Sequence, residues 1–317
     1  MLLRVSLALL LVSRVAAAAD FVEVRLMVDG HERLYQYHLP PATCGVSNLP
    51  VVMFLHGGGG SANGTRTTIG EQASDRNCYI HVFPEGTRLP GGGAAWTPGD
   101  CVGLSSQSGY SGPSTPPGCA AGPEQAGVND VHYIAAVLDD LKAKTAFNAR
   151  RVYAGGWSHG GGMTHRLACE LSDRITAIAP MEGTIKVAQC TPARAVPVIE
   201  WGSLGDTTSP FGGGNGDTSV PYSVFVHLAV SNLPPYQSPT STFVVQSVVV
   251  PGATDSVKQW LGGKDGSAVI LHTLSSQLPH NWLNENPPAF DWQETNWAFF
   301  SQYALPAAAG RQRAVRH

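Results

Sequence analysis

Apolar and polar side chains alternate near the start of the chain, and this alternation predicts its first element. Residues 21–39 hold two such runs, which are separated by Asp29-Gly30. An Asp-Gly pair between two alternating runs is a strong signal for a β-hairpin. We therefore expect an antiparallel hairpin at this end of the fold.

Further along, the apolar positions form short unbroken runs, which are typical of strands buried on both faces. The runs occupy residues 50–55, 79–83, 151–154, 175–180, 196–200 and 269–274. Between them Val131, Ile134, Leu138 and Leu141 follow the helical period, and residues 290–303 predict a closing helix. Strands separated by helices indicate an α/β fold: a mostly parallel central sheet with helices on both faces and the hairpin as an antiparallel edge.

Composition narrows the class of protein. Of the 317 residues 43% are hydrophobic and 14% charged, and the formal net charge is -3, so a large core can be buried and a basic nucleic-acid binder is disfavoured. Residues 90–127 and 207–221 lack any period, and loops of this length tend to be functional. No linker or repeat divides the pattern. We expect one domain over residues 20–305 and a disordered tail over residues 306–317.

The first nineteen residues resemble a cleavable secretory signal, with an apolar run followed by alanines ending at Ala19. We therefore expect a secreted, extracellular chain that starts near Asp20. In that compartment an even set of cysteines favours disulfides. Sequential pairing would close short or moderate loops and predicts three bridges: Cys44 with Cys78, Cys101 with Cys119, and Cys169 with Cys190. Asn63-Gly64-Thr65 matches an N-glycosylation acceptor.

The strongest chemical signal is Gly156-Trp157-Ser158-His159-Gly160, which lies between a predicted strand and a helix-compatible segment. In a G-x-S-x-G elbow the serine occupies a strained turn, and glycines avoid clashes with neighbouring backbone. The strand at residues 51–55 runs into His56-Gly57-Gly58-Gly59-Gly60, and such turns expose N–H groups that hold an oxyanion. These motifs predict that Ser158 is the nucleophile. The predicted oxyanion hole consists of the N–H groups of Gly58 and His159, with Gly57 as an alternative to Gly58.

A serine nucleophile needs an acid and a histidine, and in this arrangement both follow it along the chain. Asp206 lies in a loop just after the strand at residues 196–200, and His280 follows the strand at residues 269–274. We therefore predict Asp206 as the acid and His280 as the base. The alternatives rank lower because of their position in the chain: Glu200, Asp217 and Asp255 for the acid, and His159, His165, His227 and His272 for the base. No histidine or cysteine spacing fits a metal site, and no metal or other cofactor is expected.

Together these motifs resemble the α/β-hydrolase fold, and more narrowly the secreted polyhydroxybutyrate depolymerase and feruloyl esterase group near carbohydrate esterase family 1. Supporting matches are Phe83-Pro84-Glu85-Gly86, Trp96-Thr97-Pro98-Gly99-Asp100-Cys101, Asn129-Asp130-Val131, Leu167-Ala168-Cys169 and Ala179-Pro180. The resemblance spans residues 34–303 and implies a triad of Ser158, Asp206 and His280. The chain departs from the group at residues 201–203, which are Trp-Gly-Ser instead of His-Gly-Thr, and around His280, where the usual glycines and Trp-Pro are missing.

We expect a secreted serine esterase that hydrolyses carboxylic esters through an acyl-enzyme. The candidate substrates are feruloyl or acetyl esters of plant polysaccharide and poly(3-hydroxybutyrate)-type polyester. The alternatives are a serine peptidase of the same fold and a non-catalytic secreted binding protein with a relic pocket. Trp96, Trp201 and Trp282 are predicted to bind substrate. The expected partner is the ester substrate, as a small molecule or a polymer; nucleic acid, membrane and an obligate protein partner are not expected.

Overall fold

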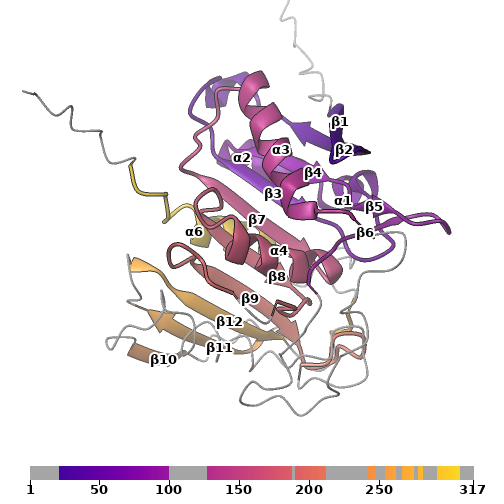
Figure 1. Ribbon diagram of the computed structural model, residues 1–317. Coiled ribbons are helices and arrows are strands. Elements are labelled where there is room, and N and C mark those ends of the chain that lie inside the picture. Colours follow the sequence, from indigo (N-terminus) through magenta and orange to yellow (C-terminus); the bar gives the residue numbers. More distant parts are fainter. Residues whose placement is uncertain are drawn as a thin grey trace, which may run out of the picture.

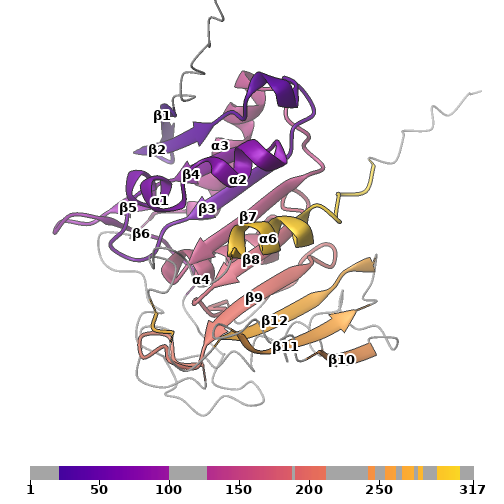
Figure 2. The ribbon, with the colours of Figure 1, turned by 180° about the vertical axis from the view of Figure 1, so that it is seen from behind.

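The computed structural model describes residues 21–99, 127–187, 190–211, 242–246, 254–261, 266–274, 278–280 and 291–307. Ten strands of these residues form one sheet that helices cover on both faces (Figures 1 and 2). The strands are β1 (Val22–Val28), β2 (His31–His38), β3 (Val51–Leu55), β4 (Ile80–Pro84), β7 (Val152–Trp157), β8 (Ala177–Met181), β9 (Val198–Ser203), β10 (Thr242–Gln246), β11 (Thr254–Leu261) and β12 (Val269–Leu274). This is the predicted α/β architecture.

The strand order across the sheet is β1-β2-β4-β3-β7-β8-β9-β12-β11-β10. From β4 to β12 all neighbouring strands are parallel. Consequently their carboxyl ends meet along one edge of the sheet, where the loops that carry a functional site collect.

The predicted hairpin is confirmed as β1 and β2, which pair antiparallel up to Val28 and His31. Asp29 and Gly30 have φ angles of 50° and 81°. Positive φ at both central residues is the requirement of a two-residue turn matched to strand twist, and it explains the Asp-Gly pair. β2 then pairs antiparallel with β4 and attaches the hairpin to the sheet (Figure 1).

The opposite edge is a finding that the sequence pattern did not predict. There β11 pairs antiparallel with β12, and β10 pairs antiparallel with β11. The sheet is therefore antiparallel at both edges and parallel only in the middle (Figure 1). A small two-stranded ribbon of β5 (Thr87–Arg88) and β6 (Ala94–Ala95) also lies at the start of the aperiodic segment 90–127.

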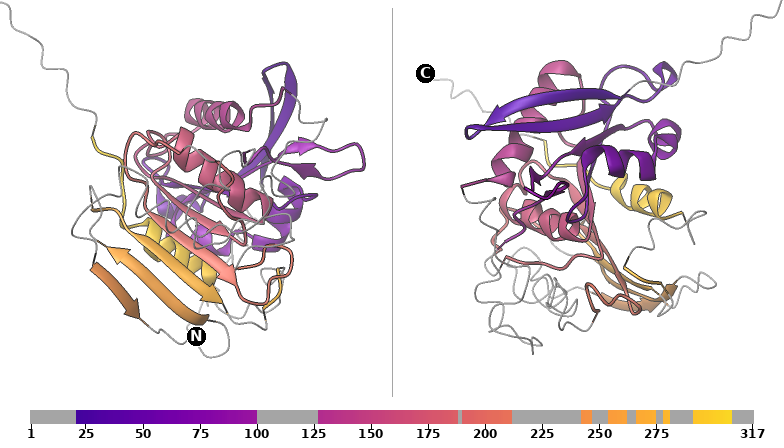
Figure 3. Two further views of the ribbon diagram at one scale, coloured as in Figure 1. Left: turned by 60° about the horizontal axis from the view of Figure 1, so that its bottom comes forward. Right: turned by 90° about the vertical axis from the view of Figure 1, so that its right-hand side faces the viewer.

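Two groups of helices cover the sheet. On one face lie α3 (Asp130–Lys144) and α4 (His159–Glu170), and on the other lie α1 (Ala62–Ile69), α2 (Gln72–Asn77) and α6 (Trp292–Phe300) (Figures 1 and 2). The side view in Figure 3 shows α6 and α4 on opposite sides of the sheet. Helix α3 confirms the predicted helical period and is capped by Asn129, whose side chain accepts N–H bonds from the first turn.

Strand β3 shows why these apolar runs are unbroken. Val51, Met53 and Leu55 join the core cluster under α3 and α4, whereas Val52 and Phe54 join the cluster under α1 and α6. Successive side chains of a strand point to opposite faces, so a strand with helices on both sides needs apolar residues at every position. All five side chains are buried.

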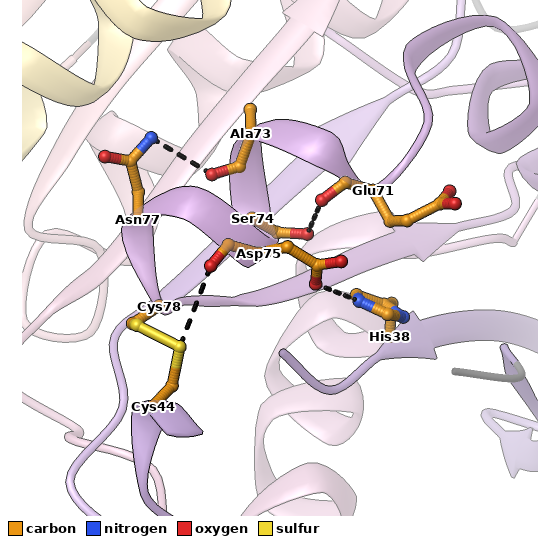
Figure 4. The surroundings of a disulfide bond; sticks show 8 residues. All are labelled: His38, Cys44, Glu71, Ala73, Ser74, Asp75, Asn77 and Cys78. Atoms are coloured by element: carbon orange, nitrogen blue, oxygen red, sulfur yellow. Dashed lines mark hydrogen bonds and ion pairs between the residues drawn. A yellow bond between two sulfur atoms is a disulfide. The ribbon is translucent and has the colours of Figure 1, made fainter. Parts of the chain in front are cut away.

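Two of the three predicted disulfides are confirmed. Cys44, in the short helix η1 (Ala42–Cys44), bonds to Cys78 just after α2, and Cys169 near the end of α4 bonds to Cys190. Around the first bridge the Asp75 carboxylate lies 2.7 Å from His38, which ties α2 to β2 (Figure 4). The third predicted pair, Cys101 with Cys119, falls outside the described residues, as do residues 1–19, Trp282 and residues 308–317 of the predicted tail.

None of the helices formed by the described residues has the length and apolar character needed to cross a membrane.

Candidate active site

The candidate nucleophile lies in a strained turn between β7 and α4. Ser158 has φ 56° and ψ -118°, which is a backbone conformation that residues other than glycine rarely adopt. Its N–H donates to the Met181 carbonyl at 2.7 Å, and its own carbonyl accepts from Gly162 at 3.0 Å. The turn is therefore fixed from both sides and holds Ser158 at the carboxyl edge of the sheet.

The glycines of the elbow are required by close backbone contacts. A Cβ on Gly160 would lie 2.3 Å from the Leu55 carbonyl oxygen, and one on Gly156 would lie 2.5 Å from the Gly160 oxygen. A Cβ on Gly183 would lie 2.0 Å from the Ser158 oxygen. Any side chain at these positions would displace the Ser158 turn, in agreement with the steric reason for the G-x-S-x-G pattern.

Three side chains from three different strand ends form one hydrogen-bonded chain. His280 Nε2 lies 2.8 Å from Ser158 Oγ, and His280 Nδ1 lies 2.6 Å from Asp206 Oδ2. Asp206 is 4% exposed, so its bond to the imidazole is shielded from water. The structure thus brings together the three residues that the sequence singled out, in the geometry of an activated serine.

Several donors converge on the Asp206 carboxylate. Its second oxygen accepts the N–H groups of Thr208 at 2.8 Å and Ser209 at 2.7 Å. Burial alone raises the pKa of Asp206, but hydrogen bonds from His280, Glu182 and Ser209 outweigh it and leave the pKa below its ordinary value. The acid is therefore held as an anion beside the imidazole.

Trp157 and Ser203 hold the His280 segment, and neither was predicted. The indole Nε1 of Trp157 donates to the His280 carbonyl at 2.8 Å, and the two rings are 5.1 Å apart. The Ser203 hydroxyl donates to the Leu278 carbonyl. The sequence shows a tryptophan inside the G-x-S-x-G motif and a serine at the end of a predicted strand. Their role could not be predicted, because it depends on contacts with residues more than 70 positions away in the chain.

The glycine loop after β3 lies directly against the elbow. A Cβ on Gly58 would lie 3.7 Å from the Cβ of His159, so the two predicted oxyanion donors are neighbours. The N–H of Gly59 donates to the Ala94 carbonyl, and the N–H of Gly60 donates to the Gly57 carbonyl. Neither N–H is therefore available for an oxyanion. The His159 N–H belongs to the first turn of α4, where backbone donors have no partner within the helix. This leaves the N–H groups of Gly58, of the alternative Gly57 and of His159 as the candidate donors for an oxyanion.

His56 braces the glycine loop from below. Its Nδ1 bonds the Gly57 carbonyl at 2.7 Å, and its Nε2 accepts the Gly86 N–H at 2.9 Å. Burial lowers the pKa of His56 to about 4, which keeps the ring neutral and able to donate on one side and accept on the other. The histidine of the H-G-G-G motif is thus a structural support.

Three of the lower-ranked histidines have other roles, and the fourth, His227, lies outside the described residues. His159 Nδ1 accepts the Trp96 N–H at 3.2 Å, and burial, followed by the charge of Lys186, lowers the pKa of His159 to about 3. His165 lies 3.0 Å from Glu200 in the core. His272 stacks on a tryptophan ring, with centroids 4.0 Å apart. Each is engaged in packing or pairing away from Ser158 Oγ.

The prediction that Trp96 and Trp201 bind substrate is wrong. Trp96 is fully buried and its Nε1 donates to the His56 carbonyl at 2.9 Å, whereas Trp201 is 1% exposed and its Nε1 donates to Asn296 at 2.9 Å. Both indoles are therefore core supports under the loops. Proximity to functional loops in the sequence does not distinguish a ring that faces the solvent from one that anchors the loop beneath it.

A cavity of about 430 Å³ opens beside the glycine loop. It lies between α1 and two indole rings, and its lining includes Gly57, Gly60, Thr65, Thr68, Trp157 and Trp292.

Asn63, the predicted glycosylation site, is exposed in the first turn of α1, where its side chain accepts a bond from Arg66 at 2.7 Å. Glycosylation at Asn63 remains a prediction.

One group of potential metal ligands occurs within the described ranges. It consists of Glu182, Asp206 and His280, whose ligand atoms all lie within 4.8 Å of one another. Asp206 and His280 already bond each other, so the group is part of the serine site. Glu182 is the member that the sequence analysis missed.

Comparison with known structures shows the fold of the chain. An acetyl xylan esterase from Aspergillus awamori aligns with a TM-score of 0.56 at 12% identity, covering 88% of this chain and 99% of that chain. An S-formylglutathione hydrolase from Agrobacterium tumefaciens aligns with a TM-score of 0.56 at 10% identity, covering 90% and 95%. The chain therefore has the α/β-hydrolase fold.

At the level of sequence, feruloyl esterase B of Piromyces equi is 30% identical over 98 residues, which are 29% of this chain and 18% of that protein. The chain spans between 11% and 53% of the length of the curated relatives it matches. No protein-family model matches it. Two of these relatives are named as a feruloyl esterase and a bifunctional acetylxylan esterase/xylanase, in agreement with the resemblance to the polyhydroxybutyrate depolymerase and feruloyl esterase group.

Proposed function

We propose that this chain is a serine esterase that hydrolyses carboxylic esters. The observation that carries the proposal is the chain of two short bonds from Asp206 through His280 to Ser158 Oγ, at a turn that holds the serine in a strained conformation. A serine hydroxyl is a weak nucleophile at neutral pH, and a histidine in this position activates it.

In the proposed reaction His280 Nε2 removes the proton from Ser158 Oγ as the oxygen attacks the ester carbonyl. The carbonyl oxygen becomes an anion between the N–H groups of Gly58 and His159, each worth about 3 kcal/mol of barrier at comparable sites. The imidazolium returns the proton to the alcohol as the ester C–O bond breaks and leaves an acyl-enzyme. Water then attacks the acyl group with His280 again as base, which releases the acid and restores Ser158.

Asp206 supports both steps. Its anion accepts the His280 Nδ1 proton, fixes the tautomer that leaves Nε2 free to accept, and stabilises the imidazolium. The depressed pKa of Asp206 supports its remaining ionised at neutral pH.

We also propose the substrate class and the setting of the enzyme. Two relatives of the chain are named as feruloyl and acetylxylan esterases. We therefore propose that the substrates of this chain are feruloyl or acetyl esters of polysaccharide, with polyester as the other candidate. The two disulfides support export to an oxidising compartment. Residues 1–19 would then be the signal and residues 20–305 one catalytic domain.

The test is to express residues 20–317 and assay p-nitrophenyl acetate and butyrate, methyl ferulate and amorphous polyhydroxybutyrate in parallel. We expect turnover on at least one ester and a loss of roughly 10⁶-fold in Ser158→Ala. Ser301→Ala, at the exposed end of α6, is the matched control. Equal turnover by wild type and Ser158→Ala would contradict the proposal, and so would hydrolysis of a peptide anilide without any ester.

A further inference from the structure

Glu182 is a second buried carboxyl group at the candidate active site. It directly follows β8, just as Asp206 follows the neighbouring parallel strand β9, so both reach the same edge of the sheet. Glu182 is fully buried and has a positive φ of 51°. Its N–H donates to the Trp201 carbonyl at 2.9 Å, which fixes this unusual backbone conformation.

The contacts of the Glu182 side chain lead to Asp206. Glu182 Oε2 accepts the Ser203 N–H at 3.3 Å, and the carboxyl group shares a hydrogen bond with the carboxyl group of Asp206. The ligand atoms of Glu182, Asp206 and His280 lie within 4.8 Å of one another. The acid of the candidate triad therefore touches two groups at once, an imidazole and a second carboxyl.

A hydrogen bond between two carboxyl groups requires a proton, because ionised carboxylates are acceptors only. Two buried carboxylate anions in contact would also repel each other strongly. Asp206 accepts bonds of 2.6–2.8 Å from His280, Thr208 and Ser209, and these favour its charged form. The bond that Glu182 accepts from Ser203 is longer, at 3.3 Å, so the proton is better placed on Glu182.

Other titratable groups lie on the elements packed around this pair. They are His159 and His165 on α4, Glu200 on β9, and Lys186 further along the loop after β8. His165 and Glu200 pair with each other at 3.0 Å, and His159 is bonded to the Trp96 N–H. Glu182 in turn is hydrogen-bonded to Asp206.

We propose that Glu182 is a protonated positioning residue that donates a hydrogen bond to Asp206 and thereby orients the acid that holds His280. A neutral donor at this point leaves one negative charge beside the imidazole. It also fills the space next to Asp206 so that the carboxylate has a single orientation toward His280 Nδ1. The inference rests on the proposed function, because its kinetic test requires that the chain hydrolyses an ester.

The test compares three variants with wild type: Glu182→Gln, Glu182→Ala and, as a matched control, Glu170→Gln at an exposed position of α4. Glutamine keeps the volume and an N–H donor but cannot ionise, whereas alanine removes the donor. The measurement is kcat and KM for p-nitrophenyl butyrate between about pH 5 and about pH 9, where the acid limb reports protonation of the base. Thermal unfolding confirms that each variant is folded.

We expect Glu182→Gln to keep kcat within about threefold of wild type and the acid limb within about 0.2 pH units. Glu182→Ala should lower kcat by about tenfold or more with KM nearly unchanged. It should also move the acid limb to higher pH, because Asp206 loses a donor and stabilises the imidazolium more strongly.

Opposite outcomes would overturn the inference. If Glu182 were ionised, Glu182→Gln would remove a negative charge beside His280 and move the acid limb to lower pH by about 0.5 or more. Glu182→Ala kinetics equal to wild type would show that the bond positions nothing. Should alanine fail to fold, the glutamine variant alone still decides the charge state.

Failure of the proposed function can be told apart from failure of this inference. If wild type hydrolyses no ester, the downfield proton resonance between His280 Nδ1 and Asp206 replaces kinetics as the readout. We expect this resonance to titrate alike in wild type and Glu182→Gln and to move in Glu182→Ala. An unchanged resonance in Glu182→Ala would contradict the inference whatever the substrate.

Discussion

Two buried histidine–carboxylate pairs of this fold differ in what surrounds them. His280 and Asp206 are 2.6 Å apart at the carboxyl edge of the sheet, and His165 and Glu200 are 3.0 Å apart in the core between α4 and β9. The first imidazole also reaches the hydroxyl of Ser158. A buried histidine–carboxylate pair is therefore not a sign of catalysis by itself; its position at a strand end decides what the imidazole can reach.

The two carboxyl groups also differ in their donors. Backbone N–H groups of Thr208 and Ser209 bond Asp206, and the bond from Ser209 helps to keep its pKa low. Glu200 lies inside β9, where backbone donors are used by the sheet, and burial raises its pKa to about 7. A loop just past a strand can supply unpaired N–H groups to an acid, whereas the strand itself cannot.

The largest difference between the pairs should appear in catalysis. We expect Asp206→Asn to lower kcat for p-nitrophenyl esters by about 10⁴-fold, because the amide favours the wrong imidazole tautomer. Glu200→Gln, the matched change in the other pair, should keep kcat within about threefold, since it touches no reacting atom. A comparable loss in both variants would show that the two pairs act together and would break the comparison.

The second difference should appear in stability. His165→Ala removes the partner of Glu200 and leaves a fully buried carboxylate, so the free energy of unfolding should fall by about 3–5 kcal/mol at pH 8. Urea unfolding followed by tryptophan fluorescence measures this change, with exposed His132→Ala as the control. A loss below about 1 kcal/mol would mean that Glu200 is neutral at this pH.

The smallest difference concerns pH. The pKa of Glu200 in the folded chain is about 7, above the ordinary carboxyl value, so the folded state holds a proton that the unfolded state has lost. Stability from this group is therefore present at low pH and is lost as the pH rises towards 7.

A tenfold difference in proton affinity between the folded and unfolded states is worth about 1.4 kcal/mol. We expect Glu200→Gln to flatten the fall in unfolding free energy between about pH 5 and about pH 8 by about 1–3 kcal/mol. Parallel curves for wild type and Glu200→Gln would disprove the raised pKa.

Much of the site follows from the sequence because strand ends are visible in it. Ser158, Asp206 and His280 each come just after an unbroken apolar run, and parallel strands bring such positions to one edge. Glu182 obeys the same rule, since it follows the run at residues 175–180, and that rule alone could have found it. It was missed because the surrounding sequence fits no known motif for a triad member.

Other parts depend on packing that the sequence does not display. The burial of Trp96 and Trp201 results from contacts with His56 and Asn296, which are 40 and 95 residues away in the chain. Strands β10 and β11 escaped prediction because, among the described residues, they pair with each other and with β12 at an edge, where continuous apolar patterning is not required. Local pattern thus predicts the middle of the sheet better than its margins.

The positions of the two disulfides have a consequence for producing the protein. Cys44 and Cys78 lie before the start of β4, Cys169 lies in the last turn of α4, and Cys190 lies between β8 and the start of β9. Both bridges therefore fasten the amino ends of the strands, opposite the serine. Expression in a reducing cytosol would forfeit about 3–4 kcal/mol for each closed loop. Such a preparation should have a lower yield and a shorter shelf life, while the molecules that do fold keep an intact reaction centre.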